Sequence, residues 1–274
     1  MLVESKSNLA RLMATENLMV EQKHVQTAYF DLKNRVLVVP ILDGNLSPEL
    51  YDLLLGHEVG HARYTPAEGW HDAISGRGRN FKGFLNVVED ARIEKMMKRR
   101  YPGLAKTFYN GYKELTDQDF FQIGDDKVET YNLADRVNLW FKIGNYTDIP
   151  IERGEETEIV NLVADSETFA DVLIAAEELY KYCKQKQQEE TKIQIDDLQS
   201  QSSGSSQQPA SDFSDQQEGE NDQPSSEGSE GSSSNQDSSQ PKQNPSTSNE
   251  GGEDNEPEVK TMEKLEEALK DLIN

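Results

Sequence analysis

The chain has 274 residues, one cysteine and a formal net charge of −23. The acidic balance argues against general nucleic-acid binding, which relies on basic patches, and a single cysteine excludes an internal disulfide. No stretch is apolar enough to cross a membrane, and the charged start does not resemble a signal peptide, so we expect a cytoplasmic protein without nucleic-acid or membrane partners.

The first fifty residues predict a helix followed by a β-hairpin. An amphipathic helix is expected over residues 3–17. Stretches rich in β-branched, leucine and aromatic residues then predict strands over 27–32 and 35–39, which a compact turn at Lys33 and Asn34 joins. The second strand could pair with an extended substrate backbone, although an ordinary buried strand would show the same pattern.

The most informative motif lies in the next predicted helix, which begins with Ser47 as N-cap and Pro48 as first helical residue. Its sequence is HEVGH, in which His57 and His61 are four residues apart and therefore project from the same face of a helix. Two imidazoles in this arrangement can bind one zinc ion. Glu58 follows the first histidine, so its carboxylate can take a proton from a water that the zinc acidifies. The spacing favours a zincin-type site over a helix that carries two histidines by chance.

A zinc hydrolase usually needs a third protein ligand. The helix predicted over 80–100 offers two adjacent acids. Glu89 lies on the flank of the apolar stripe, where a carboxylate needs a partner, so we expect it to be the third ligand. Asp90, on the wetter side, is the alternative, or else it hydrogen-bonds a ligand histidine. The other histidines of the chain, His24 and His71, are weaker candidates.

Three more residues near these motifs have structural interpretations. Gly60 indicates close approach of a neighbouring strand or helix. Arg92 is expected to form a salt bridge with a nearby acid of its helix, although it could also stabilise a developing oxyanion. Glu94 is expected to be a solvated charge. The dipeptide Trp70-His71 is expected in a loop near the motif, where it lines the cleft or fills a gap.

The motifs HEVGH and LNVVEDARIE together resemble the metallopeptidase-like N-terminal module that accompanies von Willebrand A domains in cobaltochelatase T-subunit-like proteins of bacteria and tailed phages. The likeness covers about the first two-thirds of the chain and implies a zincin-like core with zinc as cofactor. The site that it implies consists of His57, Glu58, His61 and Glu89 or Asp90. Relatives usually continue into a von Willebrand A domain, and this sequence stops before one. The Glu-x-x-x-Asp pattern of thermolysin-like enzymes is also missing.

The rest of the chain predicts more helices and a long polar segment. Three helices with apolar spacing are expected at 104–115, 132–143 and 167–186. Residues 199–256 are rich in Ser, Gln and acids and poor in apolar residues, so we expect a disordered acidic linker. A last amphipathic helix follows within 257–274, and we expect it to dock on a partner, with docking on its own domain as the alternative.

The sequence therefore predicts a mainly helical α+β fold in which a zincin-like core holds a small β-hairpin or sheet and the HExxH helix. A helical annex completes the domain over 1–198, before the disordered linker and the terminal helix. The expected function is that of a zinc-dependent metallopeptidase acting on a peptide or protein substrate. The resemblance also implies an alternative, a non-catalytic adaptor that works with a MoxR- or cobaltochelatase-type AAA+ ATPase and a von Willebrand A protein, as in cobalt chelation.

Overall fold

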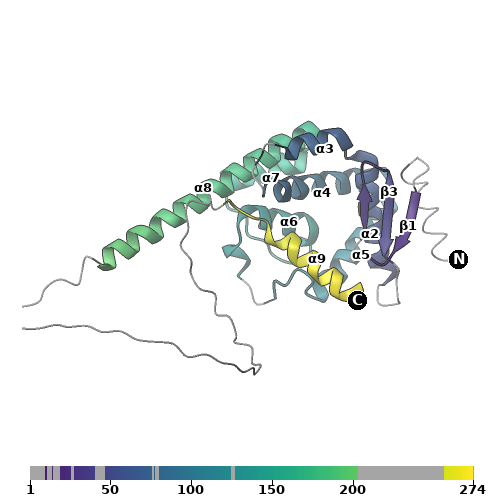
Figure 1. The fold of residues 1–274 in the computed structure, drawn as a ribbon. Helices are drawn as coiled ribbons and strands as arrows, with labels where there is room; N and C mark the ends of the chain where they lie inside the picture. The colour runs from purple at the N-terminus through teal and green to yellow at the C-terminus, as the bar shows by residue number, and fades with distance from the viewer. Residues whose placement is uncertain are drawn as a thin grey trace, which may run out of the picture. The chain divides into compact units, whose positions relative to one another are not determined.

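The computed structural model describes residues 10, 14, 19–25, 28–40, 47–75, 77, 80–124, 127–202 and 256–273. Over these residues the chain is mainly helical with one small sheet, as predicted (Figure 1). The chain forms two compact units, one of residues 1–193 with 255–274 and one of residues 194–254. The α-helices are α2 (Pro48–Tyr64), α3 (Ala67–Ile74), α4 (Phe81–Arg100), α5 (Pro102–Asp117), α6 (Leu133–Ile143), α7 (Glu155–Asp165), α8 (Phe169–Ser202) and α9 (Lys260–Ile273).

Two of the predicted segments fall largely outside this description. The helix expected over 3–17 is represented only by Ala10 and Ala14, both buried and helical. The predicted linker lies outside the described residues from 203 to 255, while its first residues belong to α8. None of the described helices has both the length and the apolar character that crossing a membrane requires.

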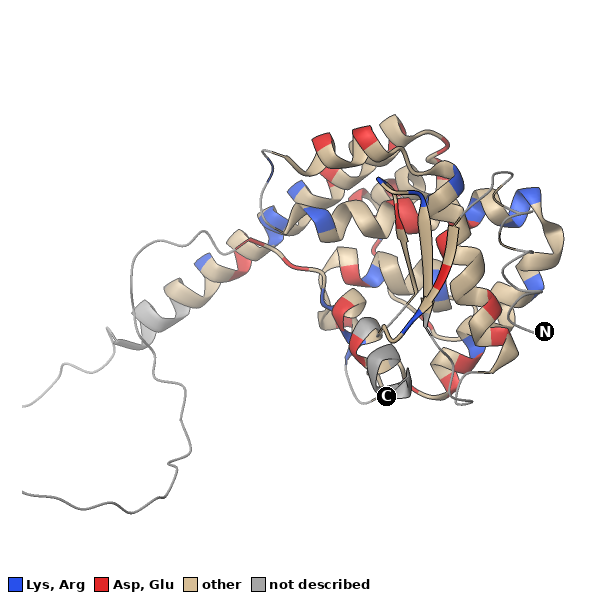
Figure 2. Ribbon diagram, turned by 45° about the vertical axis from the view of Figure 1, so that its right-hand side comes forward, with Lys and Arg blue, Asp and Glu red and all other residues tan. Residues whose placement is uncertain are grey.

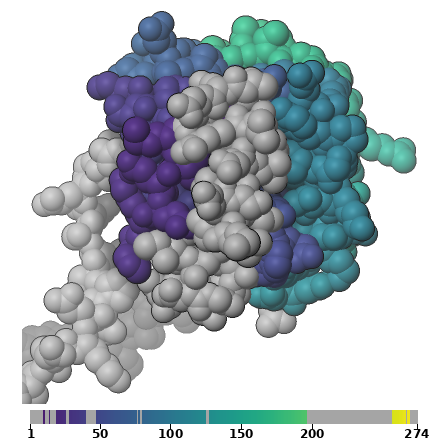
Figure 3. Space-filling model, turned by 90° about the vertical axis from the view of Figure 1, so that its right-hand side faces the viewer, coloured from purple at the N-terminus to yellow at the C-terminus, as the bar shows by residue number. Residues whose placement is uncertain are grey.

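The sheet has three strands in the order β1-β3-β2, with β1 at Met19–Lys23, β2 at Tyr29–Asp31 and β3 at Val36–Pro40. β2 and β3 form the predicted antiparallel hairpin, and Asp31 accepts hydrogen bonds from the turn. β1 pairs with β3 in parallel and was not predicted. Of the two interpretations left open for residues 35–39, the ordinary buried strand is the one observed, because β3 has a neighbour on each side. β2 is an edge strand of this sheet. In the space-filling view, residues of the N-terminal strands (purple) lie at the surface on one side of this face, and residues from the middle of the chain (teal) lie on the other (Figure 3).

The helices that carry the two motifs pack closely together. α2 begins as predicted, because the Ser47 hydroxyl accepts a hydrogen bond from the amide of Leu50 at 3.0 Å and proline occupies the first turn. A Cβ atom at Gly60 would lie only 3.1 Å from the Ile93 side chain and 3.2 Å from Met97. The expected close approach is confirmed, and it brings α2 against the middle of α4.

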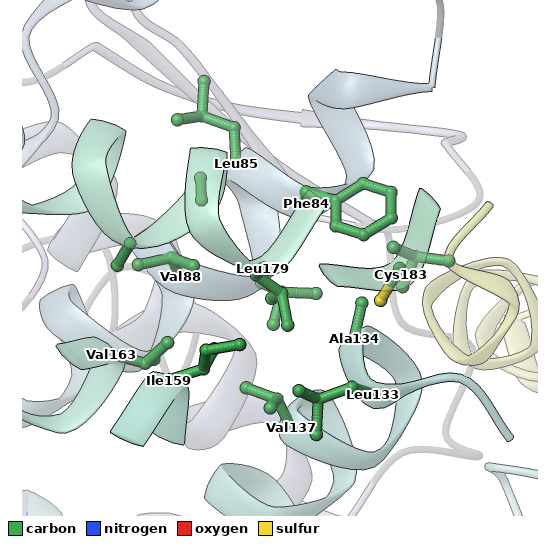
Figure 4. Close-up of a cluster of buried hydrophobic side chains, with 14 of the residues drawn as sticks. Phe84, Leu85, Val88, Leu133, Ala134, Val137, Ile159, Val163, Leu179 and Cys183 are labelled. Carbon is green, nitrogen blue, oxygen red and sulfur yellow. The ribbon is translucent and has the colours of Figure 1, made fainter. Parts of the chain in front are cut away.

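α4 passes through the helical layer and is covered by α6, α7 and α8 (Figure 1). Figure 4 shows side chains from these helices meeting in one apolar cluster, with Phe84 and Val88 of α4 close to Leu179 of α8. The helices predicted at 104–115, 132–143 and 167–186 correspond to α5, α6 and α8. α7 was not predicted, and α3 replaces the loop expected at Trp70-His71. Acidic and basic residues are interspersed along the helices, and opposite charges from neighbouring helices form ion pairs (Figure 2).

The terminal helix α9 docks on its own unit, which was the alternative prediction. It lies beside α6 (Figure 1). Thr261 is fully buried, and both its amide and its hydroxyl donate to the Asp135 carboxylate of α6 at 2.7 and 2.8 Å. Val259 packs against Gly83 at the start of α4. These buried hydrogen bonds explain why the segment binds its own domain, since leaving them unmade would cost free energy.

Candidate metal centre

Three side chains from α2 and α4 converge in a way that fits a metal ion. His57 and His61 project from one face of α2, and Asp90 faces them from α4. The Asp90 Oδ1 atom lies 3.6 Å from Nε2 of His57 and 3.3 Å from Nε2 of His61. In tetrahedral zinc sites, with bonds of about 2.0–2.2 Å, neighbouring ligand atoms are about 3.3–3.6 Å apart. Both measured distances fall in this range, and the three side chains could hold a metal ion.

Of the two acids considered from sequence, Asp90 rather than Glu89 joins the histidines. Glu89 is fully buried on another side of α4, where its carboxylate accepts two hydrogen bonds from Arg92 at 2.7 and 2.8 Å. Glu89 therefore finds its buried partner in the guanidinium of Arg92, which forms the salt bridge expected within this helix. The alternative, Asp90, replaces the preferred ligand Glu89. His24 and His71 are exposed and lie outside the group.

Hydrogen bonds to the other ring nitrogens orient both histidines. Nδ1 of His57 lies 3.1 Å from the carboxylate of Glu94, so this nitrogen carries the proton and Nε2 keeps its lone pair for a metal. Nδ1 of His61 lies 3.0 Å from the Thr65 hydroxyl. That hydroxyl donates its proton to Glu89 and must therefore accept from His61. Glu89 thus supports the site through Thr65 without facing it.

Glu94 is buried, and the prediction of a solvated charge is wrong. Its side chain is 4% exposed, because α5 and α6 cover this side of α4. The Tyr112 hydroxyl of α5 donates to it. Burial alone would raise the pKa of Glu94, but the Lys142 ammonium and the hydrogen bond with His57 lower it to about 2. Glu94 is therefore a charged acceptor that holds one histidine in place.

Lys142 of α6 is a buried cation that the sequence did not reveal as part of the site. Its ammonium donates to Asp90 Oδ2 at 3.0 Å and lies 3.7 Å from Glu94. Although burial opposes the charge of each partner, their attraction holds the pKa of Lys142 well above, and that of Asp90 well below, the ordinary values. One Asp90 oxygen thus faces Lys142 and the other faces the histidines. Neither Lys142 nor Tyr112 stands at a motif spacing from HEVGH, so no sequence signal identified them.

Glu58 lines a cavity of about 340 Å³ together with the two histidines and Asp90. Burial raises the pKa of Glu58 to about 7, and the backbone of Phe30 in β2 hydrogen-bonds its carboxylate. Residues of β2 and Trp70 of α3 also line the cavity, so the first of the two roles considered for that tryptophan is the one observed. A carboxyl group with a pKa near neutrality, beside a potential metal site, has the properties of a general base.

Comparisons of this chain with protein-family models, curated proteins and solved structures gave no match.

Proposed function

We propose that this protein is a zinc-dependent metallopeptidase-like hydrolase with a zincin-like core. The observation that carries the proposal is the convergence of His57, His61 and Asp90 in the same cavity as Glu58. A bound zinc ion would supply Lewis-acid polarisation of a peptide carbonyl and acidification of water. The likeness of the two motifs to cobaltochelatase T-subunit-like metallopeptidase modules agrees with this assignment.

The residues of the chain divide the remaining work. His57 and His61 hold the metal through Nε2, and Asp90 completes the ligand set with one carboxylate oxygen. Glu58 would accept the proton of the attacking water and deliver it to the departing amine, because its carboxylate lines the same cavity as the two histidines and Asp90. Lys142 and Glu94 fix Asp90 and His57 so that the ligand atoms remain in place between turnovers.

The strand β2 is the element that can present substrate to this site. It is an edge strand of the described sheet, and Tyr29 and Phe30 line the cavity. Tyr29 is 44% exposed. An extended peptide can add to such an edge through main-chain hydrogen bonds, which would align its backbone with Glu58 and the histidines. This role falls to β2 in place of the strand suggested from sequence.

The test separates metal binding from hydrolysis. Purified protein is expected to bind about one zinc ion per chain and to cleave an unfolded protein substrate. Glu58→Gln should keep the metal and lose cleavage, because the amide cannot accept the proton. Glu49→Gln, at an exposed position of the same helix, is the matched control and should keep both properties. Cleavage by Glu58→Gln at the wild-type rate would contradict the mechanism. Zinc binding by a wild-type protein that cleaves nothing would favour the non-catalytic adaptor.

A further inference from the structure

Part of the wall of the cavity beside His57, His61 and Asp90 comes from α9, at the far end of the chain. Met262 and Leu265 of α9 line it together with Glu58 and the histidines. We infer that α9 is a fixed wall of the cleft and selects substrates with a large apolar side chain beside the reacting bond. This inference rests on the proposed function and names its substrate class.

Buried hydrogen bonds attach α9 to α6 and hold it at the cavity. Thr261 donates through its amide and its hydroxyl to Asp135, and its hydroxyl oxygen accepts from the Asn138 amide at 3.0 Å. Asp135 and Asn138 are each only 2% exposed. Breaking these three buried hydrogen bonds would cost free energy, so they hold the start of the helix in place, although Asn138 Oδ1 is buried without a hydrogen-bond partner among the described residues. Met262 follows Thr261 directly and Leu265 is three residues further, so both share one face of α9.

An apolar subsite forms where α9 meets α2 and α5. Leu265 packs against a cluster that includes Leu53, Tyr112 and Leu115, and these three residues also line the cavity. Leu53 precedes His57 by four residues and therefore lies on the same face of α2, slightly more than one helical turn or about 6 Å along the axis. An extended peptide advances about 3.3 Å per residue. A side chain in this subsite thus belongs to a residue within about two positions of the reacting carbonyl.

The polar groups near this subsite discriminate against charged side chains. Lys142 and Asp90 both face the cavity, but they bind each other at 3.0 Å. A substrate carboxylate or ammonium in the subsite would lose its hydration and could not gain Lys142 or Asp90 as a partner, which is unfavourable. Lys82, the other cation that lines the cavity, is exposed and keeps its own hydration. A leucine or phenylalanine side chain would instead contact Leu53, Leu115 and Leu265. Hydrophobic pockets of this size distinguish substrates by about 10-fold to 200-fold.

The experiment uses full-length protein and two readouts. The first is the ratio of kcat/KM for two peptides that differ only by Leu or Glu beside the cleaved bond. The second is binding of the same peptides to Glu58→Gln protein, which should not cleave them. This protein also carries Trp140→Phe at the exposed tryptophan of α6. Trp70 is then the only tryptophan of the chain, and its fluorescence reports from the cavity wall.

We expect the leucine peptide to be preferred at least about 10-fold in both readouts. Leu265→Lys should reduce the preference by about 10-fold, and Leu265→Ala should reduce it less, with zinc stoichiometry unchanged. Glu267→Gln, on the exposed part of the same helix, raises the net charge by the same one unit and should leave the preference intact. Hydrogen exchange of residues 260–265 verifies that α9 remains docked in each variant.

If Leu265→Lys and Leu265→Ala both still prefer the leucine peptide as wild type does, the inference is wrong. It is also wrong if protein with Leu265 unchanged binds the two peptides equally. Failure of the proposed function has a different signature. In that case no peptide is cleaved by otherwise wild-type protein, while the Trp70 titration still reports whether α9 selects the apolar side chain.

Discussion

The choice between Asp90 and Glu89 as metal ligand gives the sharpest prediction. Asp90→Asn keeps the shape of the side chain but removes its charge from the histidine pair. Glu89→Gln makes the same chemical change one residue away, on a side of α4 that faces Arg92 and Thr65. We expect the first substitution to impair zinc binding and, because the buried Lys142 loses its ion-pair partner, to lower stability as well. The second substitution should impair folding and largely spare zinc binding.

The expected magnitudes follow from what each carboxylate contacts. Structural zinc sites with four protein ligands bind with about 10–16 kcal/mol, so one ligand contributes about 3–4 kcal/mol. Asp90→Asn should therefore weaken zinc binding about 100-fold to 1,000-fold. Glu89→Gln leaves the buried Arg92 guanidinium, with 3% of its side chain exposed, without its charged partner. Breaking a buried pair in this way costs about 3–5 kcal/mol of stability. Its effect on zinc, transmitted through Thr65, should be no more than about 10-fold.

Two measurements decide the matter. Competition with a chromophoric chelator gives the zinc dissociation constant, and urea denaturation of the zinc-free protein gives the free energy of unfolding. Circular dichroism verifies that the variants are folded at the temperature of the zinc measurement. A Glu89→Gln protein that loses zinc while Asp90→Asn retains it would refute the assignment and restore the acid first preferred from sequence.

Two further predictions concern the groups around the site and the helical layer. Glu94→Gln should weaken zinc binding by about 10-fold to 100-fold, because the neutral amide holds the His57 ring less strongly; the chelator competition measures this. Glu156, although burial opposes its charge, has a lowered pKa because Arg136 binds it through two nitrogens. Its ionised form therefore adds stability at pH values above about 4.5, and this contribution is lost as the pH falls through the lower pKa of the folded state. Glu156→Gln should cost about 3 kcal/mol in urea denaturation at pH 7 and much less at pH 3, whereas the exposed Glu158→Gln should stay within about 0.5 kcal/mol of wild type at both.

Local signals in the sequence were sufficient for most of the helices and for the hairpin. Ser47 and Pro48 determine where α2 begins, and the apolar periodicity of α4 follows its buried face. β1 has no comparable signal. Its sequence, MVEQK, lacks a regular alternation, and it becomes a strand because it can pair with β3. α3 and α7 were missed because each is short and neither begins with a side chain that caps the helix, so no local signal marks where they start.

The candidate site was predictable only where its geometry is local. Two histidines four apart define a face of one helix, whatever surrounds it. The third ligand depends on which helix covers α4, and that information is not local. Asp90 and Glu94 were assigned to a wet side, but α5 and α6 close over that side and bury both acids. The expectation that one side of α4 faces solvent was wrong, because other helices enclose α4 on several faces. Its polar residues therefore contact protein partners and not solvent.

The charges of this enclosed site explain why it requires distant helices. Asp90 and Glu94 stand four residues apart on one helix face, where two carboxylates repel each other. Lys142 lies between them and offsets one of the two negative charges, and Tyr112 donates a hydrogen bond to Glu94. Lys98, 3.5 Å from Glu94, offsets the charge of that acid as well, while Asp90 turns one oxygen toward Lys142 and the other toward the two imidazoles. Two imidazoles and a carboxylate oxygen are donors that suit a divalent cation. The helices α5 and α6 are therefore part of the metal centre, since they make it possible to bury these acids in their ionised form.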